Sequence, residues 1–180
     1  EAVIDQARSA DLIVAGQADE SWEYSLLFDF PERIAIESGR PTLIVPYAGR
    51  FARVGQRALV AWNGKREATR AVFDAIPLLE QAEAVRLLWV NPGNTPSTLG
   101  SSPGADIAAA LARHGVKCEV GTSVTGGIEV GDDLLSRAAD FGADLLVMGC
   151  YGHSRFREFV FGGASRKIFK HMTVPVLMSN

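Results

Sequence analysis

The chain is poor in cysteine and has no long apolar run, and both shortages narrow the classes of protein it can be. Its 180 residues include two cysteines, Cys118 and Cys150, which form no metal-ligand pattern and suit a reducing cytoplasm. No apolar run approaches the roughly 18–20 residues that a membrane-spanning helix needs. The 18 basic and 21 acidic residues give a net charge of -3, so no broad basic surface for nucleic acid is expected. We therefore expect a cytoplasmic protein that engages neither nucleic acid nor membrane.

Groups of catalytic residues are also missing. No Ser-His-Asp set, paired catalytic carboxylates or metal cluster can be assembled from the sequence. Asp132 and Asp133 begin an expected helix, where carboxylates favour the positive end of the dipole. Cys118 alternates with valines and indicates a buried structural thiol, whereas Cys150 lies in a glycine-rich stretch and could be more exposed. A dedicated enzyme is not expected.

What the sequence does contain is a regular alternation of strand and helix patterns from residue 57 onward. Short apolar runs predict strands at 58–62, 85–90, 117–123, 144–148 and 174–178. Helical spacing of apolar residues predicts helices at 67–79, 105–114 and 129–141, with another beginning at Arg166. Residues 91–104 are almost entirely Gly, Pro, Ser, Thr and Asn and indicate a loop. The alternation predicts a doubly wound α/β fold, a parallel sheet with helices on both faces.

The first fifty residues repeat the end of the chain. Residues 10–16 mirror 143–149, and 39–46 resemble 172–178. We therefore expect residues 1–47 to be the last half of a first copy, 48–56 a linker, and 57–180 a complete second copy. Two strands cannot bury their own sheet faces, and the chain begins with Glu1 rather than Met, so we expect an upstream part to have been removed or left out.

The last strand is expected to lie at a sheet edge. Pro175 cannot donate a ladder hydrogen bond, and proline therefore prefers edge strands. An apolar edge is a pairing surface. We expect segments 42–46 and 174–178 to pair with each other, either within the chain or in a homo-oligomer such as a dimer.

A glycine-rich stretch between the fourth strand and the last helix indicates a ligand site. Gly149, Gly152, Gly162 and Gly163 follow the strand and precede the helix. Glycines let the backbone approach a ligand closely, and a helix N-terminus offers unpaired N–H groups to an anion. The pattern favours a phosphate cradle, and the alternative is that these glycines only turn the chain.

These motifs resemble those of the universal stress protein family. The resemblance rests on Gly149-x2-Gly152-x9-Gly162 and on the segment 60–65, Val-Ala-Trp-Asn-Gly-Lys, and it covers residues 55–180. It implies a five-stranded parallel sheet in the order 3-2-1-4-5, of the adenine nucleotide alpha hydrolase-like type, in a tandem chain with a truncated first domain. It also implies pairing of domains through their last strands, and in some members ATP bound at the carboxyl ends of the first and fourth strands.

The resemblance places a nucleotide site on particular residues. Asn63 stands where an Asp usually contacts ribose or a metal, which would weaken Mg²⁺ binding, and Gly163 stands where the family has Ser or Thr. Val90 is expected at the adenine, and Ser165, Arg155 or Lys65 could contact phosphate. The full expected set is Trp62, Asn63, Gly64, Lys65, Val90, Gly149, Gly152, His153, Ser154, Arg155, Gly162, Gly163, Ala164 and Ser165.

Three functions remain open at this point. The first is a stress-response protein with ATP, with or without Mg²⁺, as a regulatory ligand. The second is a nucleotide-free interaction or scaffolding protein of the same fold. The third is a weak ATPase, for which no catalytic base is assigned.

Overall fold

The computed structural model describes residues 2–18, 30–92, 104–150 and 163–180. The strands are β1 (Ile13–Gly16), β2 (Thr42–Val45), β3 (Arg57–Trp62), β4 (Ala84–Val90), β5 (Cys118–Ser123), β6 (Leu145–Gly149) and β7 (Val176–Ser179). The helices are α1 (Ala2–Ala7), α2 (Phe30–Glu37), α3 (Arg66–Asp74), α4 (Ile76–Leu79), α5 (Ala105–Arg113), α6 (Val130–Phe141) and α7 (Gly163–His171).

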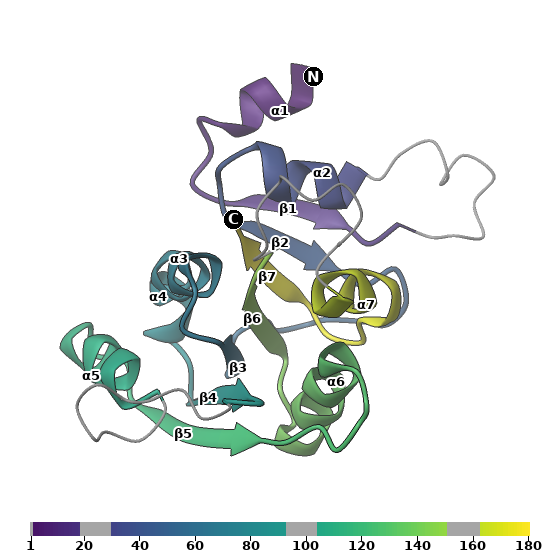
Figure 1. Cartoon of the computed structure of the whole chain (residues 1–180). Helices are drawn as coiled ribbons and strands as arrows, with labels where there is room; N and C mark the ends of the chain where they lie inside the picture. Colours follow the sequence, from purple (N-terminus) through teal and green to yellow (C-terminus); the bar gives the residue numbers. More distant parts are fainter. Residues whose placement is uncertain (1, 19–29, 93–103, 151–162) are drawn as a thin grey trace.

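All seven of these strands form one sheet in the order β1-β2-β7-β6-β3-β4-β5 (Figure 1). Reading from β5 to β7 gives the predicted order 3-2-1-4-5, and these five strands are parallel to one another. The prediction of a five-stranded parallel sheet is nevertheless too small, because the sheet continues into β2 and β1. The sheet is larger because the apolar outer edge of β7 pairs with β2.

The two segments that repeat in the sequence meet at an antiparallel pair of strands. Strand β2 runs antiparallel to β7, with Leu43 opposite Leu177 and Thr42 opposite Met178. The expected pairing of segments 42–46 and 174–178 is therefore present within the chain. Pro175 precedes β7, and its carbonyl accepts the Leu146 N–H at 2.9 Å, so the proline does not interrupt the sheet.

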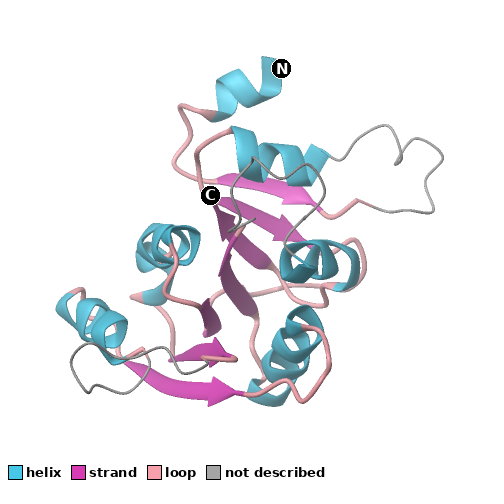
Figure 2. Cartoon of the chain, viewed as in Figure 1, coloured by secondary structure: helices cyan, strands magenta, loops and turns pink. Residues whose placement is uncertain are grey.

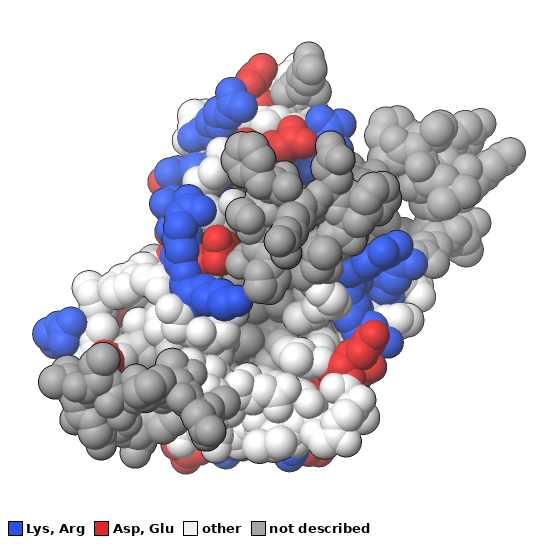
Figure 3. Space-filling model, viewed as in Figure 1, with Lys and Arg blue, Asp and Glu red and all other residues white. Residues whose placement is uncertain are grey.

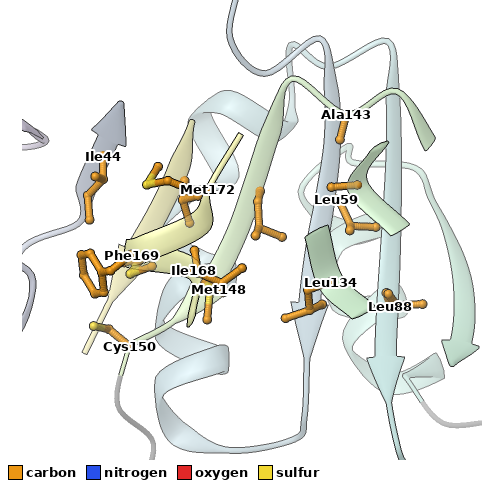
Figure 4. Packing of buried hydrophobic residues seen from close by; sticks show 14 of the residues in the cluster. Ile44, Leu59, Leu88, Leu134, Ala143, Met148, Cys150, Ile168, Phe169 and Met172 are labelled. Carbon is orange, nitrogen blue, oxygen red and sulfur yellow. The ribbon is translucent and has the colours of Figure 1, made fainter. Parts of the chain in front are cut away.

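Helices cover both faces of the sheet, as the alternating pattern predicts (Figure 2). On one face, α2, α6 and α7 pack against the strands through Ala35, Leu134, Phe141, Ile168 and Phe169, together with the strand residues labelled in Figure 4. On the other face, α3, α4 and α5 pack through Ala71, Val72, Leu79, Ile107 and Leu111.

The predicted helix 67–79 is two helices. Ala75 separates α3 from α4, and Pro77 lies in the first turn of α4. Proline has no N–H and clashes with the preceding turn inside a continuous helix, but fits the first turn of a new one. The break leaves α3 as a separate helix whose N-terminus lies beside the carboxyl ends of the central strands.

The predicted environments of the two cysteines are reversed in the structure: Cys150 is the buried one, and Cys118 is the more exposed. Cys150 is fully buried, its N–H donates to the Ser179 carbonyl at 2.8 Å, and Asn180 Nδ2 donates to the Cys150 carbonyl at 2.8 Å. These bonds hold the residue against the end of β7. Cys118 begins the outer strand β5 and is only partly buried.

No helix in the described part of the chain is long and apolar enough to cross a membrane.

Candidate functional site

A cleft of about 520 Å³ opens where β3, β4 and β6 end. From β3 the chain proceeds outward to β4 and β5 and then returns to β6 on the opposite side, so the strand order reverses at this point. Ligands of open α/β sheets bind outside the carboxyl ends of strands at such a reversal. The cleft is lined by Ala61, Trp62, Asn63, Lys65, Ala68, Leu88, Val90, Asn91, Thr125, Ile128, Glu129, Val130, Leu134, Met148, Gly149, Gly163, Ala164 and Ser165.

The floor of the cleft is apolar. It is formed by Ala61, Leu88 and Val90 on the sheet, by Met148 at the end of β6, and by Leu134 of α6. Figure 4 shows Leu88, Leu134 and Met148 among the packed residues of this face of the sheet. An apolar floor with polar groups at its margin suits a flat heterocycle better than a small polar solute.

Three helices begin at the margin of the cleft. Lys65, Glu129 and Gly163 line it at the starts of α3, α6 and α7. Lys65 has extended backbone and makes no side-chain capping bond, so the first turn of α3 has uncapped N–H groups. The partial positive charge of a helix N-terminus favours a bound anion.

Basic side chains flank this region. Figure 3 shows Lys and Arg gathered over α3 and over α7 on the viewed face. Helix α3 contains Arg66 and Arg70, and helix α7 contains Arg166, Lys167 and Lys170. Carboxylates offset part of this charge, because Arg66 lies 3.8 Å from Glu67, Arg70 lies 2.8 Å from Asp74 and Lys167 lies 3.1 Å from Glu129.

Asn63 closes a tight turn between β3 and α3. Its Oδ1 accepts the Lys65 N–H at 3.0 Å, and Gly64 between them has φ of 71°. The amide oxygen expected to face a ribose or a metal is therefore engaged by the backbone in this structure. Among the described residues, no cluster of three or more His, Cys, Asp or Glu side chains is placed to hold a metal ion.

Gly149 is required by packing. A Cβ built on it would lie 2.5 Å from the Glu67 backbone carbon and 2.6 Å from the Ala68 nitrogen. The lack of a side chain thus lets the first turn of α3 lie directly on the end of β6. Gly163 differs, because no described atom lies within 4 Å of the Cβ that would be added there.

Asn91, in the predicted loop 91–104, also belongs to the cleft. Asn91 has φ of 49°, its Oδ1 accepts the Thr125 N–H at 3.0 Å, and its Nδ2 donates to Thr125 Oγ1 at 3.1 Å. These bonds fasten the end of β4 to the segment after β5. Asn before Pro was the available signal, since Asn tolerates the left-handed region and bonds local backbone.

Lys167 joins α7 to the start of α6. Its Nζ lies 3.1 Å from Glu129 and 3.2 Å from Asp132, and hydrogen bonds to Glu129 and then to Asp132 raise the pKa of Lys167. Asp133 is buried, with Oδ1 at 3.4 Å from Arg137 Nε. The two aspartates expected at a helix start therefore have different environments.

The structure brings most of the predicted residues together. Lining the cleft are Trp62, Asn63, Lys65, Val90, Gly149, Gly163, Ala164 and Ser165. Gly64 lies beside the Trp89 ring rather than in the lining. The predictions for Gly152, His153, Ser154, Arg155 and Gly162 fall outside the described residues.

Fold and cleft together define an α/β protein with a ligand cleft at the reversal of strand order. The chain belongs to the universal stress protein family, whose model matches residues 55–180. No curated protein matches the chain.

Solved structures support the fold across the whole chain. A universal stress protein from Archaeoglobus fulgidus DSM 4304 superposes with a TM-score of 0.76 at 16% identity, covering 99% of this chain and 64% of that one. A putative universal stress protein from Pseudomonas aeruginosa UCBPP-PA14 gives 0.59 at 14% identity, with 98% and 66% covered. A universal stress protein in complex with cAMP gives 0.52 at 19% identity, with 71% and 98% covered. This chain thus spans about two thirds of the length of the first two proteins.

Proposed function

We propose that the cleft binds an adenine nucleotide, with ATP the expected ligand, and that the nucleotide acts as a regulatory ligand of this universal stress protein. The observation that carries the proposal is the combination of an apolar floor with helix N-termini at the same margin. A base would lie on Leu88, Val90 and Leu134, and phosphates would lie at the starts of α3 and α7. The related protein crystallised with cAMP supports an adenine nucleotide as the class of ligand.

The proposed binding of the nucleotide does not require Mg²⁺. Hard cations favour carboxylate oxygens, and Asn63 supplies an amide oxygen that already accepts the Lys65 N–H. Glu129, the acidic residue lining the cleft, lies 3.1 Å from Lys167 Nζ. We therefore expect nucleotide affinity to change little when Mg²⁺ is removed with a chelator.

Gly163 offers the sharpest test, because a side chain there meets no described atom within 4 Å. Gly163→Asp places a carboxylate at the start of α7, where it stabilises the helix but repels phosphate. Gly163→Asn is the neutral control of the same size. Calorimetric titration with ATP, ADP, AMP and cAMP should show at least about a tenfold loss of ATP affinity in the Asp variant, or about 1.4 kcal/mol.

The expected pattern separates binding from folding. The Asp variant should unfold at the same or a higher temperature than the wild type, while the Asn variant should keep most of its ATP affinity. Equal ATP affinity in the Asp and Asn variants would place the phosphates elsewhere. No saturable binding of any of the four nucleotides below about 1 mM would remove the nucleotide proposal.

A nucleotide-free interaction protein is the second candidate. Two observations favour it, since packing alone accounts for Gly149 and the Asn63 amide oxygen is engaged within its own turn. A weak ATPase has less support, because Glu129 is tied to Lys167 and the described lining includes no other carboxylate to serve as a base.

We also propose the division of the chain into residues 1–47 as the last half of a first copy, 48–56 as a linker and 57–180 as a complete copy. Support comes from the repeat in the sequence and from the antiparallel pairing of β2 with β7.

A further inference from the structure

Gln17 is a buried polar residue that directly follows β1. It is 8% exposed, and its backbone N–H continues the pairing of β1 with β2 by donating to the Val45 carbonyl at 2.7 Å. A side-chain amide has two N–H donors and one acceptor oxygen, and burying it costs free energy unless these groups have partners. The partners of the Gln17 amide therefore show which parts of the chain this side chain holds together.

The Gln17 amide binds the end of α7. Its Nε2 donates to the Phe169 carbonyl at 2.8 Å and to the Lys170 carbonyl at 3.2 Å, and its Oε1 accepts the Tyr47 N–H at 3.3 Å. Because α7 ends at His171, both carbonyls lie in its last turn, where carbonyls commonly have no N–H partner within the helix. One side chain of the N-terminal segment, which contains β1 and β2, thus caps a helix of the other part of the chain.

Helix α7 extends from this cap to the cleft. Its nine residues make about two and a half turns, and the first three, Gly163, Ala164 and Ser165, line the cleft. Ile168 and Phe169 are buried in the same core as Ile44 of β2 (Figure 4). Since consecutive turns of a helix are hydrogen-bonded to one another, a loosened last turn weakens the support of the first.

The position of α7 also sets the position of the start of α6. A Cβ built on Gly131 would lie 2.6 Å from the Lys167 Cβ and 3.2 Å from the Ala164 carbonyl oxygen, so the two helices are in close contact there. The ammonium group of Lys167 lies 3.1 Å from the Glu129 carboxylate. Because Glu129 lines the cleft, a shift of α7 would alter two margins of the cleft together.

We propose that Gln17 is a positioning residue that couples the cleft to the N-terminal segment through α7. The inference rests on the proposed nucleotide site. A nucleotide that orders the first turn of α7 stabilises the bonds of Gln17 at the last turn, and because such coupling is reciprocal, loss of these bonds weakens the nucleotide. The effect of nucleotide binding is therefore transmitted to the ends of β1 and β2, where Gln17 bonds Tyr47.

Two variants of the whole chain separate the parts of the Gln17 amide. Gln17→Met keeps the size of the side chain and removes its donors and its acceptor. Gln17→Glu keeps an acceptor for the Tyr47 N–H but places a carboxylate at the carbonyl end of α7, where the helix dipole repels it. Arg40→Met is the matched control, because it removes a side-chain donor whose acceptor, the Ala10 carbonyl, lies within the N-terminal segment.

NMR without nucleotide tests the positioning of α7. Both Gln17 variants should exchange the amide protons of residues 167–172 at least about tenfold faster than the wild type, and the amide signals of Ala164 and Ser165 should shift. Arg40→Met should leave these rates and signals unchanged. Faster exchange confined to residues 170–172, with unchanged Ala164 and Ser165 signals, would reduce Gln17 to a local cap and overturn the proposal.

ATP then tests the coupling. Calorimetric titration should show about threefold weaker binding in Gln17→Met, a larger loss in Gln17→Glu and no loss in Arg40→Met. In the wild type, ATP should slow exchange of the Tyr47 amide proton, and in Gln17→Met it should not. Unchanged Tyr47 exchange in the ATP-bound wild type would overturn the coupling without recourse to any variant.

Failure of the nucleotide site has a different signature. A wild-type protein that binds no ATP removes the proposed function and with it the coupling to nucleotide. The exchange rates without nucleotide still decide whether Gln17 positions the first turn of α7.

Discussion

At the scale of residues, two glycines of the glycine-rich stretch have different surroundings in the folded cleft. Gly149 and Gly163 look alike in the sequence, yet α3 lies against the first and nothing described lies against the second. The order of the glycines in the sequence does not indicate that α3 packs on Gly149. The same holds for Asn91, whose two bonds to Thr125 join segments that are 34 residues apart.

The contrast between the two glycines leads to a stability prediction. Gly149→Ala should lower the free energy of unfolding by about 1–3 kcal/mol, because the new methyl group would overlap the backbone of α3. Gly163→Ala is the control and should change stability far less. Urea unfolding of both variants without nucleotide measures the difference, and equal stabilities would contradict the close approach of α3.

The cysteines give a prediction about reactivity and pH. Burial raises the pKa of the Cys150 thiol, as Glu32 also does, and burial raises the pKa of the partly exposed Cys118 as well. A raised pKa leaves little thiolate at pH 8, so labelling of the native protein should be slow, confined to Cys118, and faster as pH rises.

The matched variant for this experiment is Cys118→Ser. It should label only after denaturation, when Cys150 becomes accessible. Rapid labelling of native Cys118→Ser protein would show that Cys150 is reached without unfolding.

At the scale of elements, short apolar runs predicted the strands well, and helical spacing of apolar residues predicted the helices well. Strands β3 to β6 were expected within a residue or two, and α5 and α6 were expected nearly to their ends. The interruption at Ala75 was missed because the apolar spacing continues through it while Pro77 requires a new first turn. Of the apolar floor of the cleft, Val90 was predicted, whereas Leu134 and Met148 were not, since they lie in patterns that indicate only a helix face and a buried strand.

The contact between α6 and α7 gives a prediction at this scale. Lys167→Met should lower stability slightly, and the loss should shrink in high salt because the ion pairs are partly exposed. The pKa of Lys167 is raised in the folded state. Its contribution to the free energy of unfolding is therefore complete below the ordinary lysine pKa, and it is lost as the pH rises through the raised pKa.

Chemical unfolding at neutral and strongly alkaline pH measures this effect. Lys117→Met, at an exposed lysine on a different surface, is the control and should show no such dependence. A stability difference that stays constant with pH would show that the ammonium charge of Lys167 is not what joins the helices.

At the scale of the molecule, the family and the strand order of residues 57–180 could be predicted, but the extent of the sheet could not. Each copy alone has an apolar edge, and the sequence repeat indicates that these edges are alike. The sequence does not determine whether these edges pair within a chain or between chains. The structure places Ile44 of β2 in the same core as Met178 of β7.

This shared core predicts that the chain unfolds as one unit. Ile44→Ala should destabilise the whole sheet by about 2–5 kcal/mol, because Ile44 is fully buried at the pairing of β2 with β7. Val124→Ala, at a highly exposed position, is the control and should be nearly neutral. Scanning calorimetry should show one transition for each protein, and two separate transitions would mean that the copies fold independently.

The register of β2 and β7 is symmetric about the Leu43–Leu177 pair, because the repeat equates residues 42–44 with 176–178 and Thr42 lies opposite Met178. This symmetry bears on how such a chain can arise. Two separate copies that paired their last strands about a two-fold axis would form the same antiparallel strand pair in a homodimer. Joining their genes head to tail would preserve every backbone hydrogen bond of this strand pair. It would also end the requirement that both copies have the same sequence. After fusion, one copy could keep its glycines while the other lost them, which is the difference between the segments that come after Gly149 and Gly16.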